Sequence, residues 1–190
     1  QDNQQNTPPV NPVPEAPEDL SQVTPQLPKD HLPIPLVRQA TSHTCGAAAL
    51  LSVFVYWDVY FETESDLAKT LGATEKQGVH PSKLITFAKE LGLEAQMKEH
   101  STIEDLQQAL KLGQTVIVDF QAWPNDEKEI PWRERWEDGH YAVVVGLDKH
   151  FIYLMDPSIF NSYSYLPIRE FNERWHDYEF ESNGKKWFNQ

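Results

Sequence analysis

Residues 39–57 join a lone cysteine to a continuous apolar run and read Gln39-Ala-Thr-Ser-His-Thr-Cys45-Gly-Ala-Ala-Ala-Leu-Leu-Ser-Val-Phe-Val-Tyr-Trp57. The run after Cys45 is apolar on nearly every face of a helix, so we expect a buried helix. A thiol at the start of such a helix meets unpaired backbone N–H groups, which favour the thiolate. The stretch therefore predicts a nucleophile, although a free cysteine is more often a small buried apolar residue.

The length and the composition predict one domain with a tail. The chain has 190 residues. Residues 1–35 hold nine of its 14 prolines and no aromatic residue, so we expect this segment to be disordered or extended. Residues 36–190 carry every Trp, Tyr and Phe, and we expect them to form one compact domain.

The charge and the cysteine count exclude several classes of protein. The formal net charge is −13 and the chain has no basic cluster, which argues against nucleic acid or an anionic membrane surface as partner. The longest apolar run is about eleven residues, and a membrane span needs about 20. A single cysteine excludes an internal disulfide. No histidines and carboxylates have metal-ligand spacing, so we expect no metal and no cofactor.

The N-terminus resembles that of an exported protein. The sequence starts at Gln1, ahead of a polar, Pro-rich segment, as in a periplasmic or secreted protein whose signal peptide has been removed. A trimmed chain would start in the same way. The segment is expected to be a linker, with an inhibitory strand in the substrate cleft as the alternative.

Helices are predicted in the first half and strands in the second. The helices run from Cys45 to about Trp57, from Glu64 to Leu71, from Pro81 to a stop at Gly92, and from the capping box Ser101-Thr-Ile-Glu104 to a stop at Gly113. The strands are 115–120, 141–147 and 151–155, with further strands around 163–166 and 178–181 and a short helix near 168–175. This order, with a mainly antiparallel sheet, indicates an α+β fold.

A base and its orienting acceptor are predicted from the two most apolar strands. A nucleophilic thiol needs a base, and the base needs an acceptor that orients it. His140 opens one strand and Asp156 closes the next, so pairing of these strands as a hairpin makes the two residues neighbours. His43 is a competing base, which we discount because it is only two residues from Cys45. The ordinary alternatives are a surface histidine and a turn aspartate before Pro157.

Two further groups are candidates for contact with a substrate. The amide of Gln39 and the backbone N–H of Cys45 can form an oxyanion hole, unless Gln39 only satisfies its own loop. Trp123, Trp132 and Trp136 lie in the segment before His140 and are expected to form a substrate-facing wall or lid. The alternative is that these tryptophans anchor the loop on the sheet.

Four segments of the chain, taken in order, carry a family resemblance. They are Gln39 with Thr44-Cys-Gly-Ala-Ala-Ala-Leu50; Gly78-Val-His-Pro-Ser-Lys-Leu84 with Ala88-Lys-Glu-Leu-Gly-Leu93; Gly139-His-Tyr-Ala-Val-Val-Val-Gly-Leu-Asp148; and Asp156-Pro157. The set resembles the bacteriocin-processing cysteine peptidases, which are bacterial and cut leaders after a double glycine, and their stand-alone relatives. The resemblance covers roughly residues 36–175, and the segment 121–139 is an enlarged loop by comparison.

The resemblance implies a papain-like fold and a catalytic role for each matched residue. By this match Cys45 is the nucleophile, His140 the base and later the acid, Asp156 the orienting residue, and Gln39 the oxyanion donor. The expected function is a cysteine peptidase that hydrolyses peptide bonds in a peptide or protein substrate. The alternatives are an acyl transferase of the transglutaminase or deamidase type, and a papain-like peptide-binding module without turnover. The sequence carries no signal for an oligomeric state.

Overall fold

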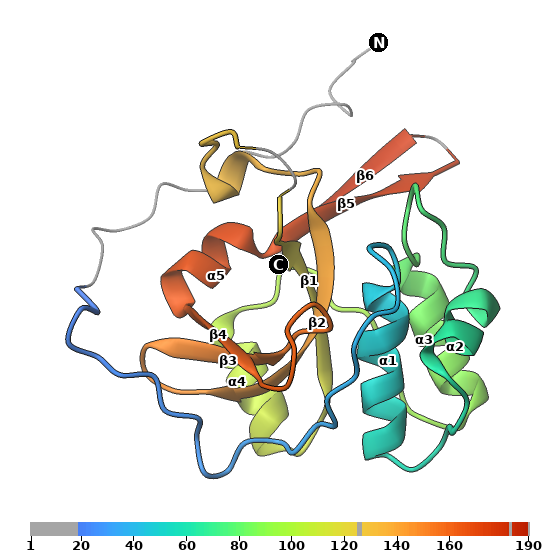
Figure 1. Cartoon of the computed structure of the whole chain (residues 1–190), viewed down its shortest axis with the longest axis horizontal. Coiled ribbons are helices and arrows are strands. Elements are labelled where there is room, and N and C mark those ends of the chain that lie inside the picture. The colour runs from blue at the N-terminus through green and yellow to red at the C-terminus, as the bar shows by residue number, and fades with distance from the viewer. Residues whose placement is uncertain (1–18, 125–126, 183, 190) are drawn as a thin grey trace.

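The protein is an α+β domain in which helices precede an antiparallel sheet, as predicted (Figure 1). The structure, a computed structural model, describes residues 19–124, 127–182 and 184–189. The helices are α1 (Cys45–Tyr56), α2 (Glu64–Thr70), α3 (Pro81–Glu90), α4 (Ile103–Lys111) and α5 (Ile168–Arg174), with the 3₁₀ helix η2 (Trp132–Glu134). The strands are β1 (Val116–Gln121), β2 (Gly139–Leu147), β3 (Phe151–Met155), β4 (Ser164–Pro167), β5 (His176–Glu181) and β6 (Gly184–Asn189).

The central sheet has the order β1-β2-β3-β4, and β5 and β6 form a separate hairpin. Helix α1 packs on one face of β2, and α4 and α5 contact the sheet on the side of the second hydrophobic core. Strand β2 alternates between the two cores, with Tyr141 and Val143 in the first and Ala142 and Val144 in the second. Burial on both faces explains why this strand is a continuous apolar run.

Helix α1 lies unusually close to β2 because its second residue is a glycine. A Cβ atom at Gly46 would lie 3.1 Å from Cδ2 of Tyr141 and 3.2 Å from Cβ of Val79. Both neighbours are buried. The glycine after Cys45 therefore sets how closely the start of α1 approaches the sheet.

Two local predictions need correction. The capping box of α4 consists of Thr102 and Asp105, one residue later than predicted: Thr102 N donates to Asp105 Oδ2 (2.8 Å) and Asp105 N donates to Thr102 Oγ1 (3.2 Å). Both candidate pairs have the same spacing, but Ser101 is buried, which leaves the exposed Thr102 to cap the helix. Strand β6 was not predicted, because its charged and aromatic sequence lacks a clear strand pattern.

The structure describes only the second part of the predicted tail, residues 19–35. Residues 1–18 lie outside the described residues, and so do the predictions of disorder, cleft occupancy and export that rest on them. Residues 19–35 contain neither helix nor strand, but they pack on the domain: Leu32 N donates to Val145 O (2.8 Å) and Ile34 belongs to the core. Packing of this segment therefore begins before the predicted boundary at residue 36, because prolines hold the backbone extended at a low entropic cost.

No helix among the described residues is long and apolar enough to cross a membrane.

Candidate active site

Cys45 is the first residue of α1 and is buried, with 8% of its surface exposed. The preceding residue Thr44 turns back on residue 41: its Oγ1 donates to Thr41 O (3.3 Å) and accepts from Thr41 N (3.1 Å). The side chain of Thr44 therefore does not cap the helix, and the first turn of α1, all of it described, contains no acidic residue. The backbone N–H groups of this turn and the positive end of the helix dipole lie at the end of α1 where Cys45 stands.

His140 and Asp156 are neighbours, which confirms the prediction from the hairpin. His140 Nε2 donates to Asp156 Oδ1 over 2.7 Å, and both side chains are buried. Strands β2 and β3 are antiparallel, with a bulge between Val144 and Gly146, so the start of β2 lies beside the end of β3. Residues 16 positions apart are thus brought into contact by the strand pairing.

The electrostatics of this pair favour a protonated imidazole. Burial lowers the pKa of His140, but hydrogen bonds to Asp156 and Cys45 outweigh burial and raise the pKa to about 9. Because Nε2 is bound to Asp156, Nδ1 is the ring nitrogen left to the Cys45 thiol. Burial raises the pKa of Asp156, but its hydrogen bond from His140 and further donors lower that pKa below the ordinary value.

Two more donors among the described residues bind Asp156 besides His140. Ser158 N donates to Asp156 Oδ1 (2.8 Å), and Trp123 Nε1 donates to Asp156 Oδ2 (3.2 Å). The ring of Phe120 packs edge-on against the imidazole of His140, with 5.7 Å between the ring centroids. The bond from Trp123 was not predicted, because no sequence pattern relates a loop residue to a turn 33 positions away.

Gln39 is attached to the segment that follows Asp156. Its backbone N–H donates to Pro157 O (3.1 Å), and its side-chain Oε1 accepts from Ser158 Oγ (2.9 Å). The amide Nε2 donates to Thr41 O (2.7 Å), in the turn that leads to Cys45. Hydrogen bonds thus link the predicted oxyanion donor to both sides of the site.

The three predicted substrate-binding tryptophans do not form one wall. Trp136 is buried, and its ring centroid lies 4.2 Å from that of His176 and 5.0 Å from that of Trp187. It anchors the loop on the β5-β6 hairpin instead of facing a substrate, because packing among aromatic rings removes its large apolar surface from water. Trp132 is half-buried, and its ring centroid lies 3.5 Å from Cζ of Arg174 on α5. Contact of Trp132 and Trp123 with a substrate stays a prediction.

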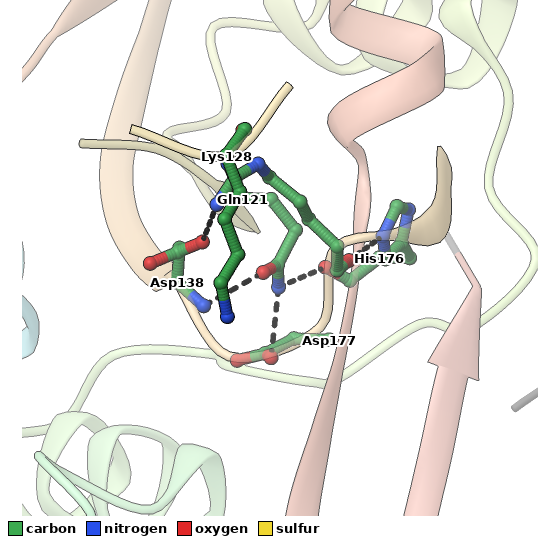
Figure 2. A network of polar contacts seen from close by, with 6 residues as sticks. Gln121, Lys128, Asp138, His176 and Asp177 are labelled. Atoms are coloured by element: carbon green, nitrogen blue, oxygen red, sulfur yellow. Dashed lines mark hydrogen bonds and ion pairs between the residues drawn. The ribbon is translucent and has the colours of Figure 1, made fainter. Parts of the chain in front are cut away.

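Gln121 ties the enlarged loop to the neighbouring strand (Figure 2). Its side-chain Oε1 accepts from Asp138 N (2.8 Å), and its Nε2 donates to His176 O and to Asp177 Oδ1, both at 3.0 Å. Arg135 in the same loop pairs with Asp138 (2.9 Å). These bonds close the base of the loop just before His140 and hold β5 against β1.

Three carboxylates form a cluster that the sequence analysis did not predict. They belong to Asp119 on β1 and to Asp177 and Glu179 on β5, and one oxygen from each lies within 4.8 Å of the others. Asp119 is 58 or more positions away from the two residues of β5, so no local spacing in the sequence predicts the cluster. Carboxylate oxygens suit a cation, either a hard metal ion or a basic side chain.

Comparisons with known proteins agree on one family. A model of the Peptidase_C39 like family matches residues 31–183. The transport/processing ATP-binding protein ComA is 28% identical to this chain over 138 residues, in Streptococcus pneumoniae strains ATCC BAA-255 / R6 and ATCC BAA-334 / TIGR4 alike. The match covers 72% of this chain and 17% of ComA, so the chain spans about a sixth of the length of these curated relatives.

Solved structures share the fold. A protein of Bacillus anthracis assigned to the C39-like peptidases has a TM-score of 0.61 and 19% identity, with 80% of this chain and 92% of that chain covered. The peptidase domain of Streptococcus ComA has a TM-score of 0.57 and 19% identity, with 83% and 99% covered. These likenesses confirm the predicted fold of helices packed on a mainly antiparallel sheet.

Proposed function

Because this chain belongs to the Peptidase_C39 like family, we propose that it is a cysteine peptidase with Cys45, His140 and Asp156 as its catalytic triad. The observation that carries the proposal is the buried 2.7 Å bond between His140 Nε2 and Asp156 Oδ1, beside the cysteine that begins α1. This bond orients the imidazole and leaves Nδ1 to the thiol. The raised pKa of His140, about 9, supports an imidazolium close to the thiolate at neutral pH.

The proposed reaction has two steps. The Cys45 thiolate attacks the carbonyl carbon of the scissile peptide bond and forms a C–S bond, and His140 donates its Nδ1 proton to the leaving amine as the C–N bond breaks. His140, now neutral, takes a proton from water, and the resulting hydroxide attacks the acyl-enzyme and breaks the C–S bond. Asp156 stabilises the imidazolium that is present before the first proton transfer and after the second.

We further propose Gln39 as a donor to the oxyanion of the tetrahedral intermediate. Its Oε1 is held by Ser158 Oγ and one N–H points to Thr41 O, which fixes the plane of the amide. The amide group has two N–H donors, so the second is available to an oxyanion at Cys45. The backbone N–H of Cys45, at the start of α1, is the other donor in this proposal.

Alkylation by iodoacetamide tests the triad without knowledge of the substrate. The native protein is labelled between about pH 5 and about pH 9 and read by intact mass, alongside His140→Ala and His43→Ala. We expect rapid labelling below about pH 7 that His140→Ala slows. His43→Ala is the matched control, because His43 is two residues from Cys45 and its Nδ1 lies 3.2 Å from Thr41 Oγ1, outside the proposed triad. Labelling that follows an ordinary thiol near pH 8.5 in all three proteins would contradict the triad.

Transfer of the acyl group to an amine uses the same machinery as hydrolysis and is the second candidate reaction. The two reactions differ only in the acceptor of the acyl group. Product masses from one peptide, incubated with and without a primary amine, distinguish them. We propose hydrolysis as the main reaction because the family is one of peptidases.

A further inference from the structure

The acidic cluster of Asp119, Asp177 and Glu179 lies next to the proposed active site. Asp119 on β1 is paired with Tyr141 on β2, whose ring contacts the position of Gly46, the residue after Cys45. Asp177 approaches from the other side: a Cβ atom at Gly139, the residue before His140, would lie 2.1 Å from its Oδ2. The carboxylates therefore border the segments that carry both Cys45 and His140.

The cluster is assembled by strand alternation. Asp177 and Glu179 are two residues apart on β5, so their side chains point to the same side of that strand. Strand β5 contacts β1 and β2, which brings these two side chains to Asp119. Gln121, two residues after Asp119 on β1, donates to Asp177 Oδ1 and fixes that carboxylate in place.

The cluster lacks a positive partner among the described residues. Glu179 is only 8% exposed, and no hydrogen bond or ion pair among the described residues joins its carboxylate to another side chain. Oδ1 of Asp119 is also buried without a hydrogen-bond partner. Burial of unpaired carboxylates is costly, and it raises the pKa of Asp177 to about 6 and that of Glu179 to about 8. A cation that enters the cluster would relieve this cost.

A cleft gives access to the cluster. It has a volume of about 750 Å³, and both Asp119 and Asp177 line it. Glu179, the third member, lines a separate hollow of about 190 Å³ together with His80 and Lys83. The walls of the larger cleft include apolar side chains from the helices and from the sheet, among them Leu50 of α1, Leu84 of α3 and Val118 of β1. Apolar walls that lead to buried carboxylates match a side chain with an alkyl stem and a cationic head.

We propose that the cluster of Asp119, Asp177 and Glu179 binds the cationic head of a lysine or arginine side chain of the peptide substrate. The inference rests on the proposed function, and it makes the enzyme selective for a basic residue close to the scissile bond. A basic side chain fits better than a divalent metal ion for two reasons. Asp177 Oδ1 already accepts from the Gln121 amide, which makes it a weaker ligand for a metal ion, and the apolar walls of the cleft match an alkyl stem that a hydrated metal ion lacks.

Peptide pairs that differ at one position test the selectivity. Fluorogenic peptides carry lysine or its uncharged analogue norleucine at each position near the cleaved bond, and kcat/KM is measured for the native protein, Glu179→Gln and Asp119→Asn. We expect the ratio of kcat/KM for the lysine peptide to that for the norleucine peptide to be about tenfold or more at one position. Both variants are expected to reduce this ratio towards one. Glu104→Gln removes the same charge from an exposed site on α4 and is expected to leave the preference unchanged. Equal rates for lysine and norleucine at every position would overturn the proposal.

Binding separates this inference from the proposed function. Peptide affinity for Cys45→Ala is measured by fluorescence anisotropy, with and without Glu179→Gln. A lysine preference in binding that Glu179→Gln removes supports the subsite, even if the native protein shows no turnover; absent turnover then contradicts only the proposed triad. Equal affinity for the lysine and norleucine peptides overturns the subsite. A rise in Tm with millimolar Ca²⁺ that Glu179→Gln abolishes would identify a metal site and would also overturn it.

Discussion

The hydrogen bond from Trp123 to Asp156 gives a loop residue a role in positioning the proposed triad. Trp123 is half exposed, yet its Nε1 lies 3.2 Å from Asp156 Oδ2, opposite the oxygen that His140 binds. The carboxylate thus receives donors on both oxygens. Its orientation fixes the imidazole in turn, so a change at Trp123 acts on His140 through Asp156.

Trp123→Phe tests this positioning role. The change keeps an aromatic ring but removes the donor, and the loss of one hydrogen bond to a charged group corresponds to a fall in kcat of about tenfold. KM is expected to change little, whereas a residue that only contacts substrate would raise KM. Trp132→Phe is the matched control, because Trp132 packs against Arg174 and makes no contact with Asp156 that the described structure contains. If Trp123→Phe leaves kcat unchanged and raises KM, Trp123 contacts the substrate and does not position Asp156.

The pKa of His140 predicts where activity is lost at high pH. The folded protein raises this pKa from 6.5 to about 9, so the imidazolium that protonates the leaving amine persists at neutral pH and is lost as the pH rises through about 9. Asp156→Asn removes the charge that holds the proton, and its kcat/KM is expected to fall off at a lower pH than that of the native protein. A high-pH limit at the same pH in both proteins would contradict the assigned ion pair.

His140 and Asp156 could be predicted from the sequence, but most of their surroundings could not. His140 opens the first of two adjacent apolar strands and Asp156 follows the second, and an antiparallel hairpin places the start of the first strand beside the end of the second. Trp123 and Gln39 reach the site through loops, whose path depends on contacts with distant segments. A pattern of residue types along the chain contains no information on such paths.

The contact between helix α1 and strand β2 controls where the thiol lies. Gly46→Ala would place a methyl group 3.1 Å from Cδ2 of Tyr141 and 3.2 Å from Cβ of Val79, closer than ordinary contacts. Alanine favours a helix over glycine by about 1 kcal/mol, but overpacking costs about 1–3 kcal/mol, so we expect a net loss of stability. The start of α1 must shift, so slower alkylation of Cys45 is also expected.

Urea unfolding and the alkylation rate check this prediction together. Val55→Ala is the control, because Val55 lies on the same helix with its side chain partly exposed, and the change is expected to leave the alkylation rate unchanged. If Gly46→Ala is as stable as the native protein and is alkylated at the same rate, the close approach of α1 to β2 has no energetic importance.

Elements with a strong repeating pattern could be predicted, whereas elements that depend on a distant partner could not. The short apolar runs of β1, β2 and β3 and the turn residues around α3 are local signals. Strand β6 carries two lysines in a row and forms because β5 pairs with it, placing Trp187 opposite Tyr178. The carboxylates of β5 have no local signal of burial, since the sequence does not show that β5 packs on β1.

For the whole molecule, the composition concealed how far the domain extends. Residues 19–35 are rich in proline, and that composition alone indicates disorder. Yet Leu32 and Ile34 are buried, and Tyr163 OH donates to Ile34 O over 2.6 Å. A few apolar residues among prolines are enough to dock an extended segment on a preformed sheet, and average composition does not register them.

The buried acidic cluster also predicts how the stability of the whole domain depends on pH. Burial raises the pKa of Glu179 from 4.5 to about 8 and that of Asp177 from 3.8 to about 6. For each group, between its ordinary pKa and its raised pKa, the folded state binds more protons than the unfolded state. The free energy of unfolding therefore falls as the pH rises from about 5 to about 8. The imidazole of His140 adds to the fall above pH 6.5, since its pKa is also raised by folding.

Glu179→Gln should remove much of this fall, because glutamine has no proton to lose. At about pH 8 we expect the variant to be more stable than the native protein by about 2 kcal/mol, which is typical for an unpaired polar group in the interior. At about pH 5 the native carboxyl is protonated, and the two proteins should have similar stabilities. Urea unfolding at both pH values measures the difference, with Glu104→Gln as the control for the loss of one charge from a molecule of net charge −13. Parallel curves for the native protein and Glu179→Gln would mean that Glu179 is already ionised in the folded state, and hence that a cation of the protein itself neutralises the cluster.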